Sequence, residues 1–178
     1  MRILTLVSFL FLAVGELAAS AGTPAFHWYF RENRGQWDGE VRFRCTNGER
    51  DIAFYKDKMV FSTRKTIDPG LPQEGDLPHQ QRFAKYEFLT YAVHFPGSNP
   101  NVEVAGVGQS SAYVNYITTN NAEAPIRKVP DYEAMEYRNL YPGIHLRFSV
   151  KDSLLKYDIF LEPGARLEQL RMVYEGID

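Results

Sequence analysis

Five acidic side chains could do acid–base chemistry by residue type: Glu87, Glu103, Asp131, Glu133 and Asp158. Two carboxylates that converge after folding can hydrolyse a glycosidic bond, one as the acid and the other as base or nucleophile. Most of the five, however, fall at outward positions of alternating segments, which favours charges in contact with solvent. A carboxylate-dependent glycoside hydrolase is therefore the third hypothesis for this chain, and we assign no catalytic residue.

The histidines are scattered, and no other motif for a metal or a nucleotide is present. They lie at positions 27, 79, 94 and 145, without an HxH or HExxH spacing. The sequence also has no GxSxG nucleophile motif, no Walker A loop, no dinucleotide-binding glycine pattern and no calcium loop. We expect no metal site and no cofactor, and we expect that the protein is not an enzyme.

Aromatic residues are abundant and allow a second hypothesis, a carbohydrate-binding module. The chain has 11 tyrosines and two tryptophans, Trp28 and Trp37. Aromatic rings stack on sugars, but they also fill the cores and edges of β-sheets. We expect the cluster 26–30 (FHWYF) to form a first strand. The sequence alone leaves the residues that would bind a ligand unknown.

Cys45 is the single cysteine, so an intrachain disulfide is excluded. It has the same parity as Val41 and Phe43 in an alternating segment. A buried, unreactive thiol is the expected state of such a residue.

The elements that must position these residues read as β-strands. In the stretch 144–151 (IHLRFSVK) every second residue is apolar, and the rhythm resumes over 154–161 after a short polar turn. Alternation with period two is typical of a strand buried on one face. We expect an antiparallel hairpin here, then one helical turn at 166–169 and a last strand near 170–174.

Further strands are expected on both sides of clear turn signals. Asn47-Gly48 predicts a type I′ hairpin turn between strands 41–45 and 51–55, because that turn needs positive φ at both central residues. The apolar parity switches near Leu89-Thr90, which predicts a bulge. Pro130 predicts an edge position or a boundary within 126–137. The other strands are expected at 59–63, 102–107 and 112–117, and a flexible loop rich in proline and glycine at about 66–82.

The fold class predicted from these segments is all-β, an antiparallel β-sandwich-like domain of roughly nine to eleven strands. A distorted barrel is the alternative. The formal net charge of −2 does not suggest nucleic acid or an anionic membrane as a partner.

The N-terminus indicates export. Arg2, the apolar run 3–14 and the small residues Ala19-Ser20-Ala21 have the order of a signal peptide. Gly15 and Glu16 make the apolar run too short for a membrane span. We expect a cleaved signal peptide at 1–21, one β-rich domain at 22–178, no membrane span after cleavage, and a secreted or cell-surface location.

Two stretches, FRENRGQWDGEVRFR at 30–44 and YRNLYPGIHLRF at 137–148, resemble the N-terminal β-rich domain of unknown function of large secreted Bacteroidota proteins. The resemblance implies a module that precedes β-propeller-type repeats, polycystic-kidney-disease-like domains or a sorting domain, so this chain is expected to be incomplete at its C-terminus. The resemblance implies no catalytic or binding residue. The family usually has an aspartate where this chain has His145.

These observations lead to one preferred hypothesis for function. We expect a non-catalytic structural or adhesive leader module of a secreted or cell-surface bacterial protein. Its partners would be downstream domains of a longer protein, or surface glycans.

Overall fold

The computed structural model describes residues 28–70, 83–117, 124–152 and 154–177. Over these residues the chain forms ten β-strands and one short 3-10 helix, which confirms the all-β prediction. The elements are β1 (Tyr29–Glu32), β2 (Phe43–Thr46), β3 (Arg50–Phe54), β4 (Lys58–Asp68), β5 (Lys85–His94), β6 (Glu103–Tyr116), β7 (Ile126–Tyr141), β8 (Ile144–Lys151), β9 (Leu154–Leu161), η1 (Leu167–Gln169) and β10 (Val173–Glu175).

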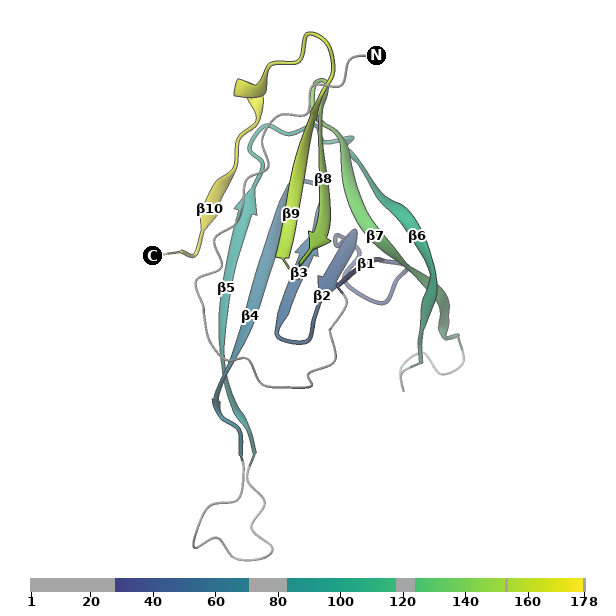
Figure 1. Ribbon diagram of the computed structural model, residues 1–178, viewed down its shortest axis with the longest axis vertical. Coiled ribbons are helices and arrows are strands. Elements are labelled where there is room, and N and C mark those ends of the chain that lie inside the picture. Colours follow the sequence, from purple (N-terminus) through teal and green to yellow (C-terminus); the bar gives the residue numbers. More distant parts are fainter. Residues whose placement is uncertain (1–27, 71–82, 118–123, 153, 178) are drawn as a thin grey trace, which may run out of the picture.

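All ten strands belong to one antiparallel sheet that curls over itself (Figure 1). Its order is β10-β5-β4-β3-β2-β1-β7-β8-β9, and β6 also pairs with β7. Strand β7 pairs with β6 along one edge. Along its other edge it pairs first with β1 and then with β8. The β8–β9 hairpin lies in front of β3 in Figure 1, and Phe54 of β3 packs against Phe148 of β8, so the body has two layers.

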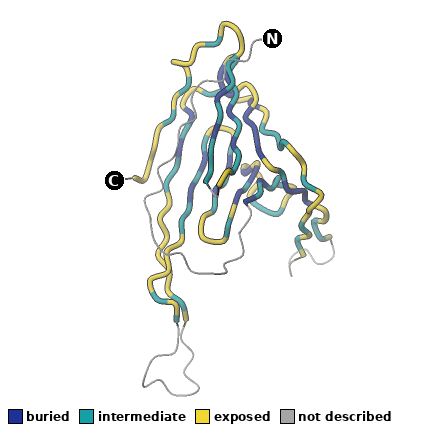
Figure 2. The backbone as a smooth tube through the Cα atoms, in the orientation of Figure 1, coloured by how far each residue is buried: buried dark blue, intermediate teal, exposed yellow. Residues whose placement is uncertain are grey.

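The core lies between these two layers, along the dark segments of Figure 2. It contains a chain of aromatic contacts: Phe30 against Phe54, Phe54 against Phe148, and Phe148 against both Tyr137 and Tyr157. Ring pairs of this kind add about 0.5–1.5 kcal/mol each to the free energy gained by burial alone. Aromatic packing between the two layers therefore holds the curl.

The hairpin predicted from the period-two rhythm is confirmed. Strands β8 and β9 pair from Ile144 opposite Leu161 to Lys151 opposite Leu154. Leu146 and Phe148 are buried as expected, and so are Tyr157 and Ile159 on the partner strand. The expected helical turn is present as η1, and the last strand, β10, begins three residues later than predicted.

The turn between β2 and β3 is a hairpin connection, but it is not the predicted type I′ turn. Gly48 has φ of 89°, whereas Asn47 does not have positive φ. The side chain of Asn47 instead accepts hydrogen bonds from the N–H groups of Glu49 and Arg50 at 3.1 and 2.8 Å. An asparagine that bonds to the backbone two and three residues ahead stabilises a turn without adopting the left-handed conformation itself.

The bulge predicted near Leu89 is absent, because β5 stays in register with β4 from His94 to Tyr86. The register shifts only between Thr66 and Asp68. Beyond the core, residues 64–68 of β4 and 85–90 of β5 continue as a two-stranded arm, the β4–β5 arm, on which both faces meet solvent (Figure 1). Tyr86 and Phe88 therefore lie on the face opposite Tyr91 and Val93 without any change of backbone.

One further prediction about strand boundaries was wrong, because segments 102–107 and 112–117 are one continuous strand, β6. Pro130 is not a boundary but lies inside β7, at a point where β7 pairs with β6 and the pairs with β1 have ended, so the predicted edge position fits locally. Pro130 is opposite Tyr113, next to a shift in the β6–β7 register. The ladder is irregular there, so the missing N–H of proline costs little.

The predicted loop at 66–82 begins later than expected, because β4 continues to Asp68. Residues 71–82 lie outside the described residues, as do the predicted signal peptide at 1–21 and its cleavage site. Among the residues that the structure describes, no helix has the length and apolar character needed to cross a bilayer.

Tyr137 joins β7 to the opposite layer through a buried hydroxyl group. Its ring is fully buried, and its hydroxyl donates to the carbonyl oxygen of Tyr55 at 2.7 Å. Burial raises the pKa of Tyr137 well above its ordinary value, and the charge of Asp57 adds to this effect.

We predict that Tyr137→Phe lowers the free energy of unfolding by about 1–3 kcal/mol, since it removes the part-buried hydrogen bond to the carbonyl of Tyr55. Urea unfolding followed by circular dichroism measures this loss. Tyr113→Phe is the control, because Tyr113 is 55% exposed and its loss should cost less than about 0.5 kcal/mol. Equal stability of the two variants would contradict the assignment.

The same variant reports on pH. An unfolded tyrosine titrates near pH 10, so Tyr137 contributes fully below that pH, and its contribution falls as the pH rises toward the folded pKa. Above pH 10 the wild type should lose stability faster than Tyr137→Phe, by about 1.4 kcal/mol per pH unit.

Cys45 is fully buried on the inner face of β2, as predicted. Burial raises the pKa of its thiol, and the charges of Asp51 and Asp131 raise it further. We predict that Cys45 does not react with a thiol reagent in the folded protein and reacts fully in denaturant. Rapid labelling under native conditions would show that the inner face opens.

Candidate binding site: a pocket of arginines and aromatic rings

A pocket of about 370 Å³ lies on the outer face of the sheet, behind the residues that point into the core. Strands alternate, so Phe30, Cys45 and Ile52 face inward while their neighbours face outward. The outward neighbours form the floor of the pocket, and a loop and the end of β6 complete it. The lining residues are Tyr29, Arg31, Trp37, Arg44, Thr46, Asp51 and Tyr116.

Arg31 is held by a carboxylate from a strand a hundred residues away. Its Nε and Nη2 donate to the two oxygens of Asp131 at 2.6 and 2.9 Å, and its Nη1 donates to the hydroxyl of Tyr116 at 3.2 Å. Burial by itself lowers the pKa of Arg31, but the hydrogen bonds to Asp131 and Tyr116 outweigh it, so the pKa is raised overall. The guanidinium group stays charged and fixed in direction.

Arg44 is held in the same way by Asp51 and lies beside an indole ring. Its Nε and Nη2 donate to the two carboxylate oxygens of Asp51. The guanidinium carbon is 5.2 Å from the ring centre of Trp37, which is a cation–π contact. Trp37 in turn meets Tyr116 nearly at right angles, with 6.0 Å between ring centres.

The side chain of Asn33 fixes the loop that carries Trp37. Its amide group donates to the carbonyl oxygens of Asp38 and Val41 at 2.7 and 2.9 Å. Its oxygen accepts from the N–H groups of Gly35 and Trp37 at 3.0 and 3.3 Å. Because one side chain satisfies four backbone groups, the loop has a defined shape, and Trp37 is positioned before any ligand arrives.

The five carboxylates considered as catalytic candidates do not form one group. Asp131 lies behind Arg31, beside the pocket, whereas Glu103 pairs with Arg138 on the far half of β7. Glu87 is opposite Lys65 on the β4–β5 arm, and Asp158 is opposite Arg147 in the β8–β9 hairpin. Glu133 is exposed on β7. Their registers place them on four different strands, with no shared pocket in the described residues.

Of the two tryptophans, only Trp37 lines the pocket, since Trp28 is 8% exposed and belongs to the core. Sequence reasoning missed Arg31, Arg44 and Tyr116, because outward charges on strands usually meet only solvent. The available signal was the alternation Arg42, Phe43, Arg44, which places arginines on the face opposite the core.

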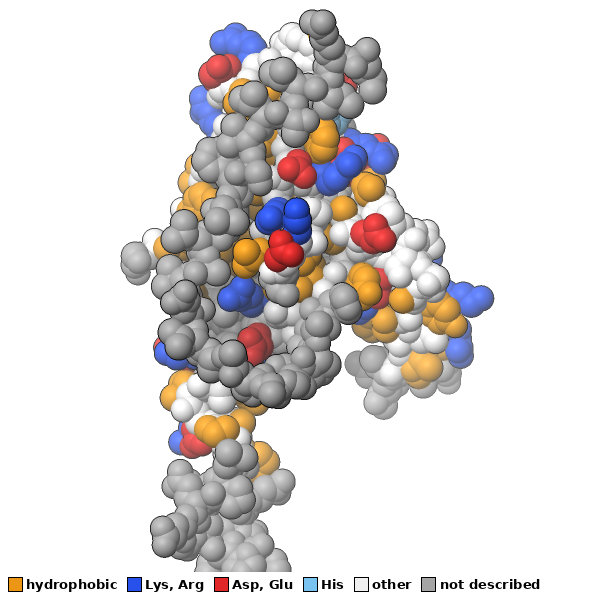
Figure 3. Space-filling model, viewed as in Figure 1, with side chains coloured by type: hydrophobic (Ala, Val, Ile, Leu, Met, Phe, Trp, Pro, Cys, Tyr) orange, Lys and Arg blue, Asp and Glu red, His pale blue; other side chains and the backbone are white. Residues whose placement is uncertain are grey.

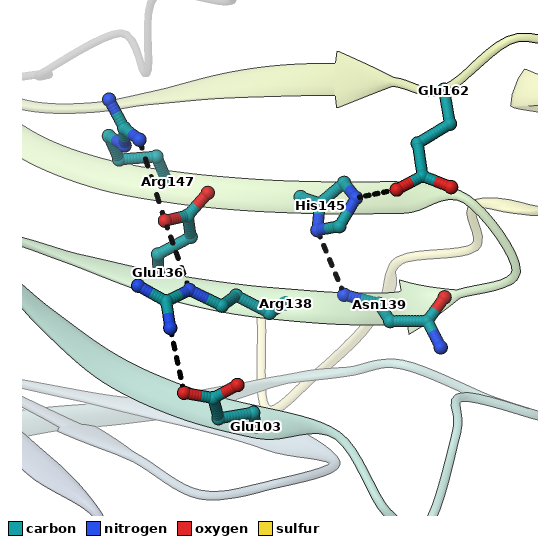
Figure 4. A network of polar contacts seen from close by, with 7 residues as sticks. All are labelled: Glu103, Glu136, Arg138, Asn139, His145, Arg147 and Glu162. Atoms are coloured by element: carbon teal, nitrogen blue, oxygen red, sulfur yellow. Dashed lines mark hydrogen bonds and ion pairs between the residues drawn. The ribbon is translucent and has the colours of Figure 1, made fainter.

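A second polar network crosses the outer face of β6, β7 and β8 (Figure 4). Glu136 lies between Arg138 at 3.6 Å and Arg147 at 3.4 Å, and Arg138 also contacts Glu103 at 2.8 Å. His145 Nε2 is 3.2 Å from Glu162, and its Nδ1 accepts the N–H of Asn139 at 3.0 Å. The opposite charges are paired along these strands, which indicates a structural role.

Hydrophobic side chains gather on the β4–β5 arm (Figure 3). Phe83, Phe88, Leu89 and Ile67 are all more than half exposed.

Within the part of the chain that the structure describes, no three histidine, cysteine, aspartate or glutamate side chains come together as metal ligands.

A family model for a domain of unknown function, DUF7948, matches residues 30–178, which include every described strand except the first residue of β1. The chain belongs to the DUF7948 family. Comparisons with curated proteins and with solved structures found no match. The pocket of this DUF7948 domain therefore has to be interpreted from its own geometry.

Two short motifs of this DUF7948 chain prove to be structural. Asn33 in the stretch 32–36 shapes the Trp37 loop, as described above. In the stretch 137–143, Asn139 has φ of 56° and its side chain accepts the N–H of Gly143 at 3.1 Å, while the hydroxyl of Tyr141 donates to the carbonyl of Pro96 at 3.0 Å. These residues close the turn from β7 into β8.

We predict that Asp131→Asn lowers the free energy of unfolding by about 2–4 kcal/mol, because it leaves the Arg31 charge half-buried without a counter-charge. The matched control is Glu103→Gln, which breaks an exposed pair with Arg138 and should cost less than about 1 kcal/mol. Chemical denaturation of both variants measures the difference. Equal losses would mean that the Arg31–Asp131 pair contributes no more than a surface pair.

Proposed function

We propose that this domain is a non-catalytic structural or adhesive module of a secreted or cell-surface protein, and that its adhesive site is the pocket around Arg44 and Trp37. The signal-peptide pattern at 1–21 supports export. Downstream domains of a longer protein, or surface glycans, are the partners that fit such a module.

One observation carries the proposal: each carboxylate at the pocket is already bound through both oxygens by a guanidinium group. This holds for Asp131 with Arg31 and for Asp51 with Arg44. Both oxygens of each carboxylate are therefore occupied by contacts within the protein. The pocket offers hydrogen-bond donors and aromatic surface in a fixed arrangement, which suits binding better than turnover.

A carbohydrate-binding module is the more specific candidate, and the aromatic lining favours it. Trp37, Tyr116 and Tyr29 surround polar groups within about 370 Å³. Aromatic rings offer an apolar face to the C–H groups of a sugar, while arginine and hydroxyl groups bind its oxygens. The volume lies at the lower end of the range of about 300–1,000 Å³ for small-molecule pockets, which suits a short saccharide.

We predict that the full chain, immobilised and exposed to a panel of polysaccharides and surface proteins, retains at least one of them, and that Trp37→Ala weakens retention about tenfold or more by removing an aromatic anchor. Tyr113→Ala is the control, since Tyr113 is exposed on β6 outside the pocket. Tryptophan fluorescence during titration gives a second readout through Trp37.

Three results would count against this proposal. Retention that survives Trp37→Ala would move the adhesive site elsewhere. A folded chain that retains nothing would leave only the structural half of the proposal. Turnover on a panel of glycosides would contradict the non-catalytic assignment.

A further inference from the structure

The outer face of the sheet places two arginines directly opposite each other. Arg31 on β1 is the register partner of Arg44 on β2. Side chains in such a pair start about 4.5–5.5 Å apart at their Cβ atoms, and like charges in these positions repel. Both side chains line the same pocket, so the repulsion acts at the site that the proposed function uses.

The two counter-charges lie on the outer sides of this pair. Asp131, on β7, is the partner of Arg31 across the strand edge away from β2. Asp51, on β3, lies one diagonal step from Arg44, across the edge away from β1. Across four strands the order of charge is therefore negative, positive, positive, negative. The four charges sum to zero, but the two at the centre of the row are positive. An anion placed between Arg31 and Arg44 is attracted by both guanidinium groups.

Arg44 also has donors left for a ligand. A guanidinium group has five N–H donors and no acceptor. Nε and Nη2 of Arg44 are used by Asp51, whereas Nη1 has no acceptor among the described residues. Arg31 uses one N–H of each of its three nitrogens for Asp131 and Tyr116, so one N–H remains on Nη1 and one on Nη2. An oxygen acceptor of a ligand is best placed at Nη1 of Arg44, which keeps both of its N–H groups for it, and the remaining N–H groups of Arg31 can add to the contact.

The aromatic rings next to this position determine what else the ligand carries. Trp37 packs beside Arg44, and Tyr116 meets both Trp37 and Arg31. Both rings line the pocket, so a ligand that also has an apolar face can contact them, which an inorganic anion cannot do. A sugar ring that carries a carboxylate fills both needs, since its C–H face packs on an aromatic ring and its carboxylate enters the positive centre.

We infer that this pocket binds a glycan through a uronic acid residue whose carboxylate lies between Arg31 and Arg44. The inference rests on the proposed adhesive function and names its ligand class. Arg44 is the anchor, and Trp37 supports the sugar ring.

The test is a calorimetric titration of the full chain with trigalacturonic acid and with its neutral counterpart, a galactose trisaccharide. We expect a preference of about tenfold or more for the acidic sugar, since charge-assisted hydrogen bonds are the stronger ones. The preference should shrink between 0.05 and 0.5 M salt, because the pocket is open to screening ions.

Three variants locate the effect. Arg44→Gln should abolish the preference for the acidic sugar, and Arg44→Lys should keep only part of it, because lysine has the charge but not the planar fork. Arg166→Gln is the matched control, since Arg166 is exposed next to η1, away from the pocket. Circular dichroism of each variant shows whether the fold is intact, and Arg44→Lys keeps the test valid if Arg44→Gln is unstable.

The outcomes separate this inference from the proposed function. Equal binding of the acidic and neutral sugars, abolished by Trp37→Ala, would overturn the inference and leave an adhesive pocket. Tighter binding of a sulfated trisaccharide, or of a peptide through its terminal carboxylate, would also overturn it. A preference that persists in Arg44→Gln would place the acidic group elsewhere. Binding of no sugar at all would overturn the inference and the carbohydrate-binding candidate, whereas retention of a surface protein that is lost in Trp37→Ala would keep the adhesive pocket.

Discussion

The architecture depends on how one strand, β7, satisfies its backbone hydrogen bonds. Strand β7 must satisfy the hydrogen bonds of two edges, and one of these edges is divided between β1 and β8. The two neighbours pair with successive stretches of that edge, and the strands that continue from them lie in two layers. The aromatic contacts of Phe148 with Phe54, Tyr137 and Tyr157 then fill the space between the layers. The curl is thus a consequence of strand pairing, and packing stabilises it.

The same pairing creates the pocket. Alternation on β1, β2 and β3 sends one set of side chains to the core and the other to the outer face, so the floor of the pocket is the reverse side of the core residues Phe30, Cys45 and Ile52. A rigid core under the pocket keeps the guanidinium groups in place. Asn33 does the same for Trp37 from the side, through backbone hydrogen bonds. The site is therefore preorganised, and binding there does not have to order a loop.

Local pattern was sufficient for some of the fold. The β8–β9 hairpin and the burial of Cys45 follow from period-two alternation, because each side chain's face is set by its immediate neighbours. The continuity of β7 through Pro130 was not predictable, since the cost of a missing N–H depends on whether the opposite ladder is regular at that point. The ion pair between Arg31 and Asp131 was not predictable either, because local sequence patterns do not show which strands pair when they are a hundred residues apart. Sequence reasoning accordingly found Trp37 as a candidate but singled out neither Arg31 nor Arg44.

The bidentate ion pair between Arg31 and Asp131 also limits which substitutions this chain can accept over evolutionary time. Each member satisfies two bonding groups of the other at a half-buried position, so replacing one alone leaves its former mate uncompensated. A substitution at position 31 or 131 is then tolerated mainly when the other position changes with it. The two positions are therefore expected to co-vary, although they are far apart in the sequence. Selection on the β1–β7 junction would be visible as correlated substitution between homologues, even in lineages that had lost whatever the pocket holds.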